Sequence, residues 1–223
     1  MQRPTTHSTR IFSTSPAIRW QMADGDPDLG FDHFREIETS LEGWQEVAIP
    51  CDVHGPLLAA GRIADPLVGR NDEACRWVED RSWWFVGTFR MSARAVRQLQ
   101  AAGSRRWALL SLDGLDTLAD IALNDQVLGS HASIHYPFER EVGRYLVPGT
   151  NRLVLRLRPG PEPVSSVESE AIRPSVRTDI PGEPGRIDLR KPQYVFGWDF
   201  TSRIVTCGIL GPVRLDVFQG PRI

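Results

Sequence analysis

The sequence of 223 residues has few cysteines, a single lysine and no long apolar run. Its three cysteines, Cys51, Cys75 and Cys207, are far apart and show neither a C-x-x-C motif nor the spacing of metal ligands. A sparse, odd-numbered set of this kind indicates a reducing compartment, in which buried thiols act as small apolar side chains. Lys191 is the only lysine among 26 basic residues, which we attribute to compositional bias rather than to function.

Charge and hydropathy exclude several classes of protein. The net charge of −2 provides no overall field that would attract nucleic acid or an anionic membrane. The first twenty residues lack the apolar core of a secretory signal, and no apolar run approaches the roughly 20 residues of a membrane helix. We therefore expect a cytoplasmic protein without a nucleic-acid or membrane partner.

Helix signals are scarce, and strand signals dominate. Short helices are predicted only over residues 53–60 and 92–102, each followed by a glycine that ends it. Short strands are predicted over residues 44–50, 83–90, 107–112, 118–123, 126–128 and 151–158, with two more between 204 and 217. Many short strands with almost no helix predict an all-β protein, a jelly-roll β-sandwich with few short helices.

The faces of two strands follow from alternation. In residues 83–90, Trp84, Val86 and Thr88 share one face, and the aromatic side chains of Trp83 and Phe85 share the other. In residues 151–158, leucines alternate mostly with arginines, so we expect one face in the core and the other in water.

The chain is predicted to form one domain. Residues 1–16 are rich in Thr, Ser and Arg and are expected to be flexible, and residues 17–220 are expected to form a single β-sandwich domain. Residues 22–36 are predicted as a loop or the start of a short helix. Residues 159–186 are rich in Pro, Ser, Glu and Gly and are predicted as a long loop, a type of segment that is often functional or mobile.

Acids and histidines in the middle of the chain are candidate ligands. Asp113, Asp116 and Asp120 suit either a ligand set or a catalytic pair, but an Asp-Gly step at position 113 more simply starts a turn. His131 and His135 are four residues apart, a spacing that places both on one face only in a helix. Because the surrounding sequence does not favour a helix, we expect no metal site.

The tryptophans are candidate sugar-binding residues, because an indole can stack on the apolar face of a pyranose. For Trp77, Trp83 and Trp84, both a place in the core and a stacking surface fit the sequence, and we favour the core. In residues 194–200 an aromatic run is interrupted by a glycine, which indicates a bulge or a close backbone approach. There Asp199 directly follows Trp198, so a stacking surface adjoins an acceptor for sugar hydroxyls.

These clusters, in this order, resemble the N-terminal domain of glycoside hydrolase family 2, specifically its β-mannosidase branch. The resemblance covers about residues 40–218. The matching stretches are WQEVAIPCDVHGPLL at 44–58, GRIADPLVGRN at 61–71, the tryptophan segment at 77–84, LDGLDTLADIALN at 112–124 and RKPQYVFGWDF at 190–200.

The resemblance implies a galactose-binding-like jelly roll. In that family, immunoglobulin-like domains and a (β/α)8 barrel with both catalytic glutamates follow this domain, and terminal β-D-mannose is cleaved with retention. No segment here resembles the barrel strands. We therefore expect the barrel to be absent from this chain, which should contain no catalytic residue, need no cofactor and be inactive alone.

The resemblance also implies a sugar-binding loop. Carried over, Trp198 borders the sugar pocket, Asp199 accepts hydrogen bonds from mannose hydroxyls, and Arg190 steadies the loop. The implied partners are a β-mannoside or related oligosaccharide and the remaining domains of a family 2 hydrolase. The family pattern Gly-Trp-Asp-Trp-Gly-Pro-Arg is altered here to Phe200-Thr201-Ser202 after the aspartate, so exclusive preference for mannose is not implied.

Two other functions fit the same residues. The chain is alternatively a free-standing carbohydrate-binding module, which predicts a self-contained surface with a preformed concave site. It is alternatively a purely structural packing domain, which, like a sugar-binding accessory domain, predicts an exposed apolar face that awaits a partner. The aromatic run at 194–200 favours the accessory domain, because isolated proteins rarely expose such a patch without a use.

Overall fold

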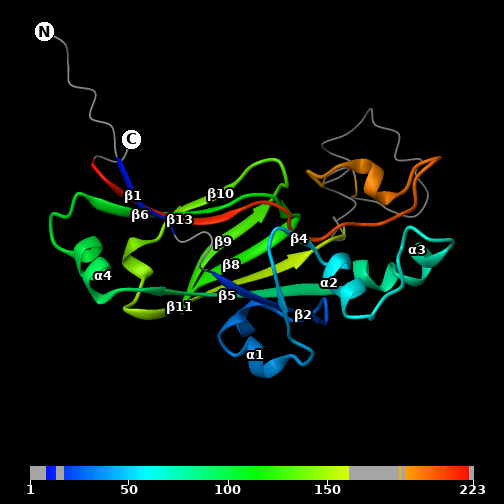
Figure 1. Cartoon of the computed structure of the whole chain (residues 1–223), viewed down its shortest axis with the longest axis horizontal. Helices are drawn as coiled ribbons and strands as arrows, with labels where there is room; N and C mark the ends of the chain where they lie inside the picture. The colour runs from blue at the N-terminus through cyan, green and yellow to red at the C-terminus, as the bar shows by residue number, and fades with distance from the viewer. Residues whose placement is uncertain (1–8, 14–17, 161–185, 187–188, 221–223) are drawn as a thin grey trace, which may run out of the picture.

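The structure of the chain, a computed structural model, describes residues 9–13, 18–160, 186 and 189–220. Residues 1–8 and 14–16 of the expected flexible segment lie outside the described residues, as do residues 161–185 of the expected long loop. Two antiparallel sheets pack face to face, and short helices lie at both ends of the sandwich (Figure 1).

Three sheets are present in the described residues, and all their ladders are antiparallel. The first contains, in order, β1 (Thr9–Ser13), β13 (Val213–Gln219), β6 (Arg106–Leu112) and β10 (Phe138–Glu141). The second contains β3 (Gln45–Val47), β2 (Arg19–Gly25), β5 (Ser82–Met91), β11 (Gly149–Arg158), β8 (Leu118–Leu123) and β9 (Gln126–Ala132). The third contains β4 (Cys51–Asp52), β12 (Gly208–Ile209) and β7 (Leu115–Asp116).

The main core lies between the two larger sheets. It is built from alternate residues of the long strands, including Trp83, Phe85 and Phe89 of β5, three leucines of β11 (Leu153, Leu155 and Leu157), and Leu110, Leu112 and Leu215 of the opposite sheet. Each such side chain contributes about 1.5–3 kcal/mol when fully buried. The alternation predicted for β5 is confirmed, since Trp84 and Val86 belong to a separate cluster on the other face.

The outer face of β11 is not in water, and the prediction for it was wrong. The helical segments η2 (Phe31–Arg35) and α1 (Ile37–Ser40) cover this face, and Phe34 and Ile37 pack on Trp84 there. Arg152 of β11 pairs with Glu38 of α1. The arginines that suggested a solvent-exposed face therefore form ion pairs beneath η2 and α1.

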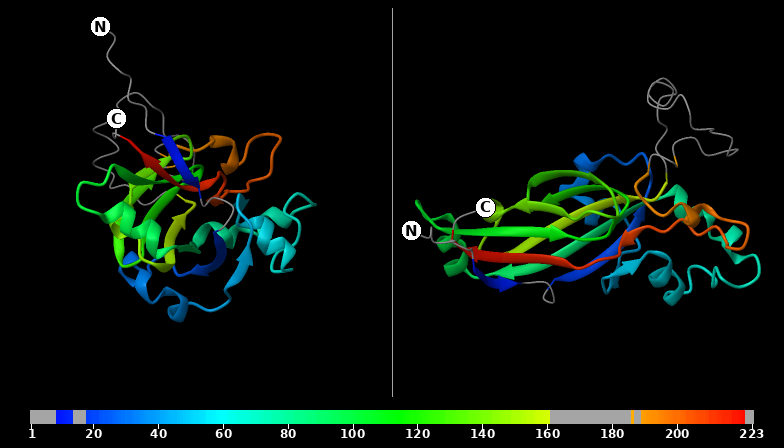
Figure 2. Two further views of the ribbon diagram at one scale, coloured as in Figure 1. Left: turned by 60° about the vertical axis from the view of Figure 1, so that its left-hand side comes forward. Right: turned by 90° about the horizontal axis from the view of Figure 1, so that it is seen from above.

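Both predicted helices are confirmed. The first is α2 (His54–Ala59), and the second is α4 (Ala93–Gln100). Ser92 caps α4, because its hydroxyl accepts a hydrogen bond from the backbone N–H of Ala95 at 3.1 Å. In Figures 1 and 2, α4 lies at one end of the sandwich, and α2 and α3 (Asn71–Ala74) lie at the other.

The N-terminal part contains two strands that the sequence did not reveal. Residues 9–13, inside the segment expected to be flexible, form β1 and pair with β13. Residues 22–25, expected in a loop, belong to β2, which pairs with β5 and buries Trp20 and Met22 in the core. Remaining short helical segments are η3 (Arg76–Asp80), η4 (Gly143–Tyr145) and η6 (Gln193–Phe196).

The all-β sandwich with few short helices is thus confirmed. The finer assignment as a jelly roll stays a prediction. Among the helices that the structure describes, none combines the length and apolar character needed to cross a membrane.

Candidate functional site

One end of the sandwich gathers most of the large apolar side chains that are exposed. The segment with α2 and α3 and the segment over residues 189–206 lie together at this end (Figures 1 and 2). Exposed side chains from this end are Leu58, Leu67, Val68, Tyr136, Tyr194, Trp198 and Phe200. A surface of this kind is typical of an interaction site.

Trp198 and Asp199 lie on a tight hairpin that projects from this end. Gly197 begins it with φ of 92°, a conformation that other residues rarely adopt. The backbones of Trp198 and Thr201 then pair with each other, which leaves Asp199 and Phe200 at the tip. Trp198 is 57% exposed and Phe200 is 84% exposed. The Asp199 carboxylate is exposed and has no hydrogen-bond or ion-pair partner within the described part of the chain.

Two anchors hold the hairpin. Phe196, just before it, is buried in a small cluster with Leu189, Val195 and Val205. Arg203, just after it, donates to the carbonyl oxygen of Phe196 at 3.3 Å and forms a two-point ion pair with Glu79 of η3, with Nε 2.9 Å from Oε1. The hairpin is therefore a fixed projection of the sandwich end.

Arg190 is placed differently from Trp198 and Asp199. Its backbone pairs with Ser133, and its carbonyl oxygen accepts a hydrogen bond from the N–H of Ile134 at 3.1 Å. The side chain of Arg190 is exposed. Among the described contacts none joins Arg190 to Trp198 or Asp199, and its role in steadying the loop stays a prediction.

The three central acids have structural partners, although not those expected. Asp113 pairs with Arg214 at 2.9 Å, and Asp120 pairs with Arg156 at 2.7 Å. Asp116 pairs with Lys191 in the interior. These contacts join distant segments, whereas the sequence indicated a local turn at Asp113 and left Asp116 and Asp120 as candidate ligands or a catalytic pair. Sequence reasoning missed Lys191 and Glu79, and the one signal for Lys191 was its being the only lysine.

The histidines and cysteines also have local environments that account for them. His131 Nε2 lies 2.7 Å from the carbonyl oxygen of Ser133, and no His, Cys, Asp or Glu grouping suited to a metal occurs in the described residues. Asp52 accepts a hydrogen bond from the ring of His54 at 2.7 Å and one from the N–H of Cys207 at 2.9 Å. Burial raises the pKa of the Cys207 thiol well above its usual range, so this thiol stays protonated and is a poor nucleophile.

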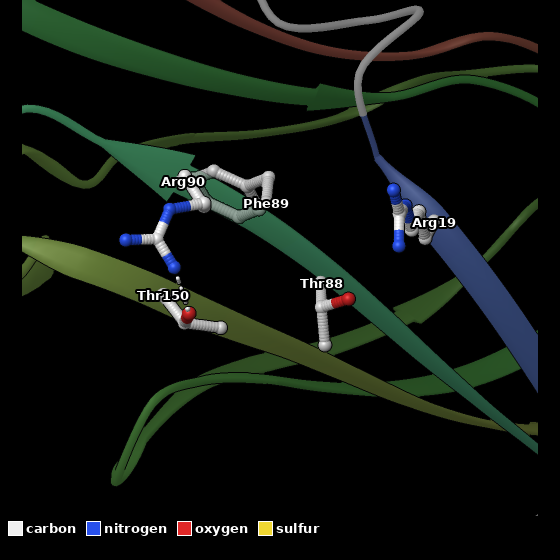
Figure 3. A pocket seen from close by; sticks show the side chains of 5 residues that line it. All are labelled: Arg19, Thr88, Phe89, Arg90 and Thr150. Carbon is white, nitrogen blue, oxygen red and sulfur yellow. Dashed lines mark hydrogen bonds between the residues drawn. The ribbon is translucent and has the colours of Figure 1, made fainter.

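A depression of about 460 Å³ lies on the outer face of the second sheet (Figure 3). Its lining comprises Arg19, Thr88, Phe89, Arg90 and Thr150. Arg90 donates to the Thr150 hydroxyl at 3.3 Å. Phe89 is only 3% exposed, so this depression offers no open aromatic face for a sugar ring. It lies at the far end of β11 from the hairpin.

The earlier tryptophans belong to the core, as favoured. Trp83 and Trp84 are both 0% exposed, and Trp77 packs on the main core at a ring distance of 6.1 Å from Trp83. Trp198 therefore remains as the exposed tryptophan, and the hairpin that carries it is the candidate site.

Comparison with known proteins identifies a matching family. The model of the glycosyl hydrolase 2 galactose-binding domain-like family matches residues 20–211. The chain is 30% identical over 210 residues to beta-mannosidase B of Aspergillus terreus, covering 93% of this chain and 22% of that protein. It is 32% identical over 184 residues to beta-mannosidase B of Aspergillus niger, covering 82% of this chain and 21% of that protein.

Solved structures agree with this match. The beta-D-mannosidase of Dictyoglomus thermophilum superposes with a TM-score of 0.68 at 26% identity, over 92% of this chain and 22% of that one. The exo-chitosanase CsxA of Amycolatopsis orientalis superposes with a TM-score of 0.52 at 15% identity, over 66% of this chain and 17% of that one, which shows a common fold only. The chain thus spans about a fifth of the length of the relatives it matches.

Proposed function

The chain belongs to the galactose-binding-like domain family of glycosyl hydrolase family 2, and from this premise we propose that it supplies part of the sugar subsite of a β-mannoside hydrolase. The matched region corresponds to the non-catalytic N-terminal domain of such hydrolases. In the proposed function, Trp198 stacks on the terminal sugar and Asp199 accepts hydrogen bonds from its hydroxyls. The catalytic glutamates and the rest of the pocket come from other domains of the hydrolase.

The observation that carries this proposal is the chemistry of the hairpin tip. A large indole is exposed beside a carboxylate that has no hydrogen-bond or ion-pair partner among the described residues, on a hairpin fixed by Arg203 and Phe196. A carboxylate accepts strong, charge-assisted hydrogen bonds from sugar hydroxyls, which offset the loss of its bound water, and an ordered indole loses little conformational entropy on stacking. The tip is thus suited to a neutral, polyhydroxylated ligand with an apolar face.

Mannose is the proposed sugar, because three of the similar proteins named above are beta-mannosidases. Phe200 stands where the family pattern has a tryptophan, so an indole N–H donor is missing at this position. We propose that the subsite therefore tolerates related sugars that differ at the hydroxyl such a donor would contact.

The alternatives find less support. A free-standing binding module needs a concave site with an aromatic platform, and the depression beside Arg90 has no exposed ring. A purely structural domain accounts for the exposed apolar side chains of Leu67 and Val68, but not for a carboxylate at the tip of the hairpin. We also keep a cytoplasmic location within the proposal, because the three cysteines are free.

The test is hydrolysis by the natural gene product that contains these 223 residues. It is assayed on p-nitrophenyl β-D-mannoside, with the glucoside and galactoside for comparison. We expect turnover of the mannoside, and a drop in kcat/KM of about 10- to 1,000-fold for Trp198→Ala and for Asp199→Asn, which corresponds to about 1.4–4 kcal/mol of transition-state stabilisation. Arg19→Ala, in the depression at the other end of β11, is the matched control and is expected to leave kcat/KM unchanged.

Each other result has a defined meaning. Unchanged kcat/KM in both hairpin variants would remove Trp198 and Asp199 from the subsite. Absence of turnover on all three substrates would overturn the proposed activity. If calorimetric titration of the 223-residue chain with β-1,4-mannobiose then gave binding, the free-standing module would replace the proposal.

A further inference from the structure

Lys191 and Asp116 form an ion pair in the interior. Both side chains are 0% exposed, and Lys191 Nζ lies 2.9 Å from Asp116 Oδ1. The ammonium also donates to the carbonyl oxygen of Thr206 at 2.6 Å and to that of Pro159 at 3.4 Å. Because a lysine ammonium has three N–H donors, these three acceptors satisfy the buried cation completely.

Asp116 uses both carboxylate oxygens in the same network. Its Oδ2 accepts a hydrogen bond from the Thr206 hydroxyl at 2.5 Å, and its Oδ1 accepts one from the hydroxyl of Thr117. Thr206 is therefore held twice, by Lys191 through its carbonyl oxygen and by Asp116 through its hydroxyl. The network joins the end of β7 to the exit of β11 and to both ends of residues 191–206.

The candidate hairpin lies between the two residues that this network joins. Lys191 precedes it and Thr206 follows it. The ring of Phe196 lies with its centroid 5.8 Å from Lys191 Nζ, immediately before Gly197 and Trp198. Fixing Lys191 against Thr206 therefore closes the base of the segment whose tip carries Trp198 and Asp199.

Stability alone does not explain a buried ion pair. Taking two charges out of water costs several kcal/mol per ion, and an apolar replacement of the same shape is often as stable or more so. The hydrogen bonds of the pair are directional, so all of them form in only one arrangement of the groups. An apolar contact imposes no such restriction.

The choice of lysine instead of arginine at position 191 also indicates that the geometry of the bonds matters. Lys191 is the only lysine among 26 basic residues, so arginine is used at every other basic position. An arginine here would bring five N–H donors in a planar fork to three acceptors, and buried donors would be left without partners. A compact ammonium with three N–H donors therefore fits this position better than a guanidinium does.

We propose that Lys191 is a positioning residue for the sugar subsite. Acting through Asp116 and Thr206, it closes the base of residues 191–206 and so fixes the direction in which Trp198 and Asp199 project. It does not touch the sugar. Its effect on the order of the hairpin is independent of the proposed function, whereas its effect on hydrolysis rests on that function.

The first experiment measures amide hydrogen exchange of the 223-residue chain. The variant Lys191→Met with Asp116→Asn removes both charges together, so neither is left buried and unpaired. We expect the amides of Gly197 and Thr201 to exchange at least about tenfold faster, while amides in the β5–β11 ladder keep their rates. Arg70→Met, which removes an exposed arginine, is the control and should change neither set.

A milder variant protects this test against loss of the fold. Thr206→Val keeps the ion pair and removes only the hydroxyl bond to Asp116, so a smaller acceleration is expected at the same two amides. Unchanged exchange at Gly197 and Thr201 in a folded variant would overturn the inference. Equal acceleration throughout the sandwich would also overturn it, because that pattern indicates a general loss of stability.

The second experiment measures hydrolysis by the natural gene product. Lys191→Arg keeps the charge and is nevertheless expected to lower kcat/KM on the β-mannoside about tenfold or more. In the Trp198→Ala background, Lys191→Arg should cause less loss than it does in the wild type, since the lysine acts through the hairpin. Losses that multiply would show that Lys191 does not act by positioning Trp198.

The two proposals fail in different ways. If the exchange rates rise as expected but Trp198→Ala itself leaves hydrolysis unchanged, the proposed function fails and the role of Lys191 in fixing the hairpin stands. If Trp198→Ala lowers hydrolysis while Lys191→Arg does not, the subsite stands and the positioning role is wrong.

Discussion

The carboxylate of Glu79 accepts two hydrogen bonds from the guanidinium of Arg203, a residue 124 positions later in the chain. The two side chains are 15% and 20% exposed, so water screens the pair only in part. The contact connects η3 to the end of the candidate hairpin. We expect Glu79→Gln to lower the free energy of unfolding by about 1–3 kcal/mol, the usual worth of hydrogen bonds to a charged group. Urea denaturation followed by tryptophan fluorescence measures this change.

An exposed pair serves as the matched control for Glu79. Arg70 and Glu73 pair at 2.6 Å with side chains that are 83% and 47% exposed. Because exposed pairs contribute little, Glu73→Gln should leave the urea midpoint unchanged. Equal shifts in the two variants would mean that the contact of Glu79 with Arg203 stabilises the chain no more than an exposed ion pair does.

The cap of α4 gives a second prediction. The Ser92 hydroxyl accepts a hydrogen bond from the N–H of Ala95, and Ser92→Ala should therefore cost about 1 kcal/mol of stability. Thermal unfolding measures the loss. Ser92→Asp keeps a capping acceptor and should retain most of the stability, so similar losses in both variants would argue against capping as the cause.

Sequence patterns predicted those elements whose signals are local. The alternation in β5 and the short helix α4 depend on neighbouring residues, and both are as expected. The strand β1 depends on pairing with β13 at the other end of the chain, and the outer face of β11 depends on Glu38, which lies 114 positions before Arg152. No local pattern carries that information.

The same division applies to the candidate site. The family resemblance predicted Trp198 and Asp199 from a short motif, and the structure shows both at an exposed tip. Their supports, Glu79 and Asp116, lie far away in the sequence and show no motif of their own. Asp116 in particular is a candidate ligand or catalytic acid in the sequence, and only the fold shows its pairing with Lys191.

A close backbone approach at Gly208 gives a third prediction. A Cβ at this position would lie 2.2 Å from the carbonyl oxygen of Cys51 and 3.0 Å from the Cα of Asp52, and φ is 156°. Since both contacts are backbone atoms, they cannot move aside without breaking the pairing of β4 and β12. Gly208→Ala should therefore destabilise by about 3 kcal/mol or more, as strain and overpacking combine. Gly55→Ala, where a Cβ meets nothing within 4 Å, is the control.

The thiol of Cys51 gives a prediction about pH. Burial, with a smaller effect from the charge of Asp52, raises the pKa of Cys51 from 9.0 to about 11. The folded chain therefore holds this proton more tightly than the unfolded chain, so the contribution to stability is complete below about pH 9 and is lost as pH rises to about 11. The free energy of unfolding should fall more steeply across this interval in the wild type than in Cys51→Ala. Parallel pH profiles for the two proteins would contradict the raised pKa.

Substitutions of the exposed aromatic residues of the hairpin allow an effect on function to be distinguished from an effect on stability. Phe200 is 84% exposed and Trp198 is 57% exposed, so neither side chain contributes much to the core. Phe200→Ala should change the free energy of unfolding by no more than about 0.5 kcal/mol, as is usual for surface substitutions. If the tip contacts sugar, the same substitution should lower kcat/KM on the β-mannoside in the natural gene product. Phe200→Trp should restore an indole N–H and so raise the preference for the mannoside over related sugars.

Val127→Ala, which removes an exposed apolar side chain from β9, is the control for both measurements. A stability loss in Phe200→Ala as large as its loss of activity would mean that the ring serves the fold, since a residue retained for sugar contact changes the second quantity and not the first.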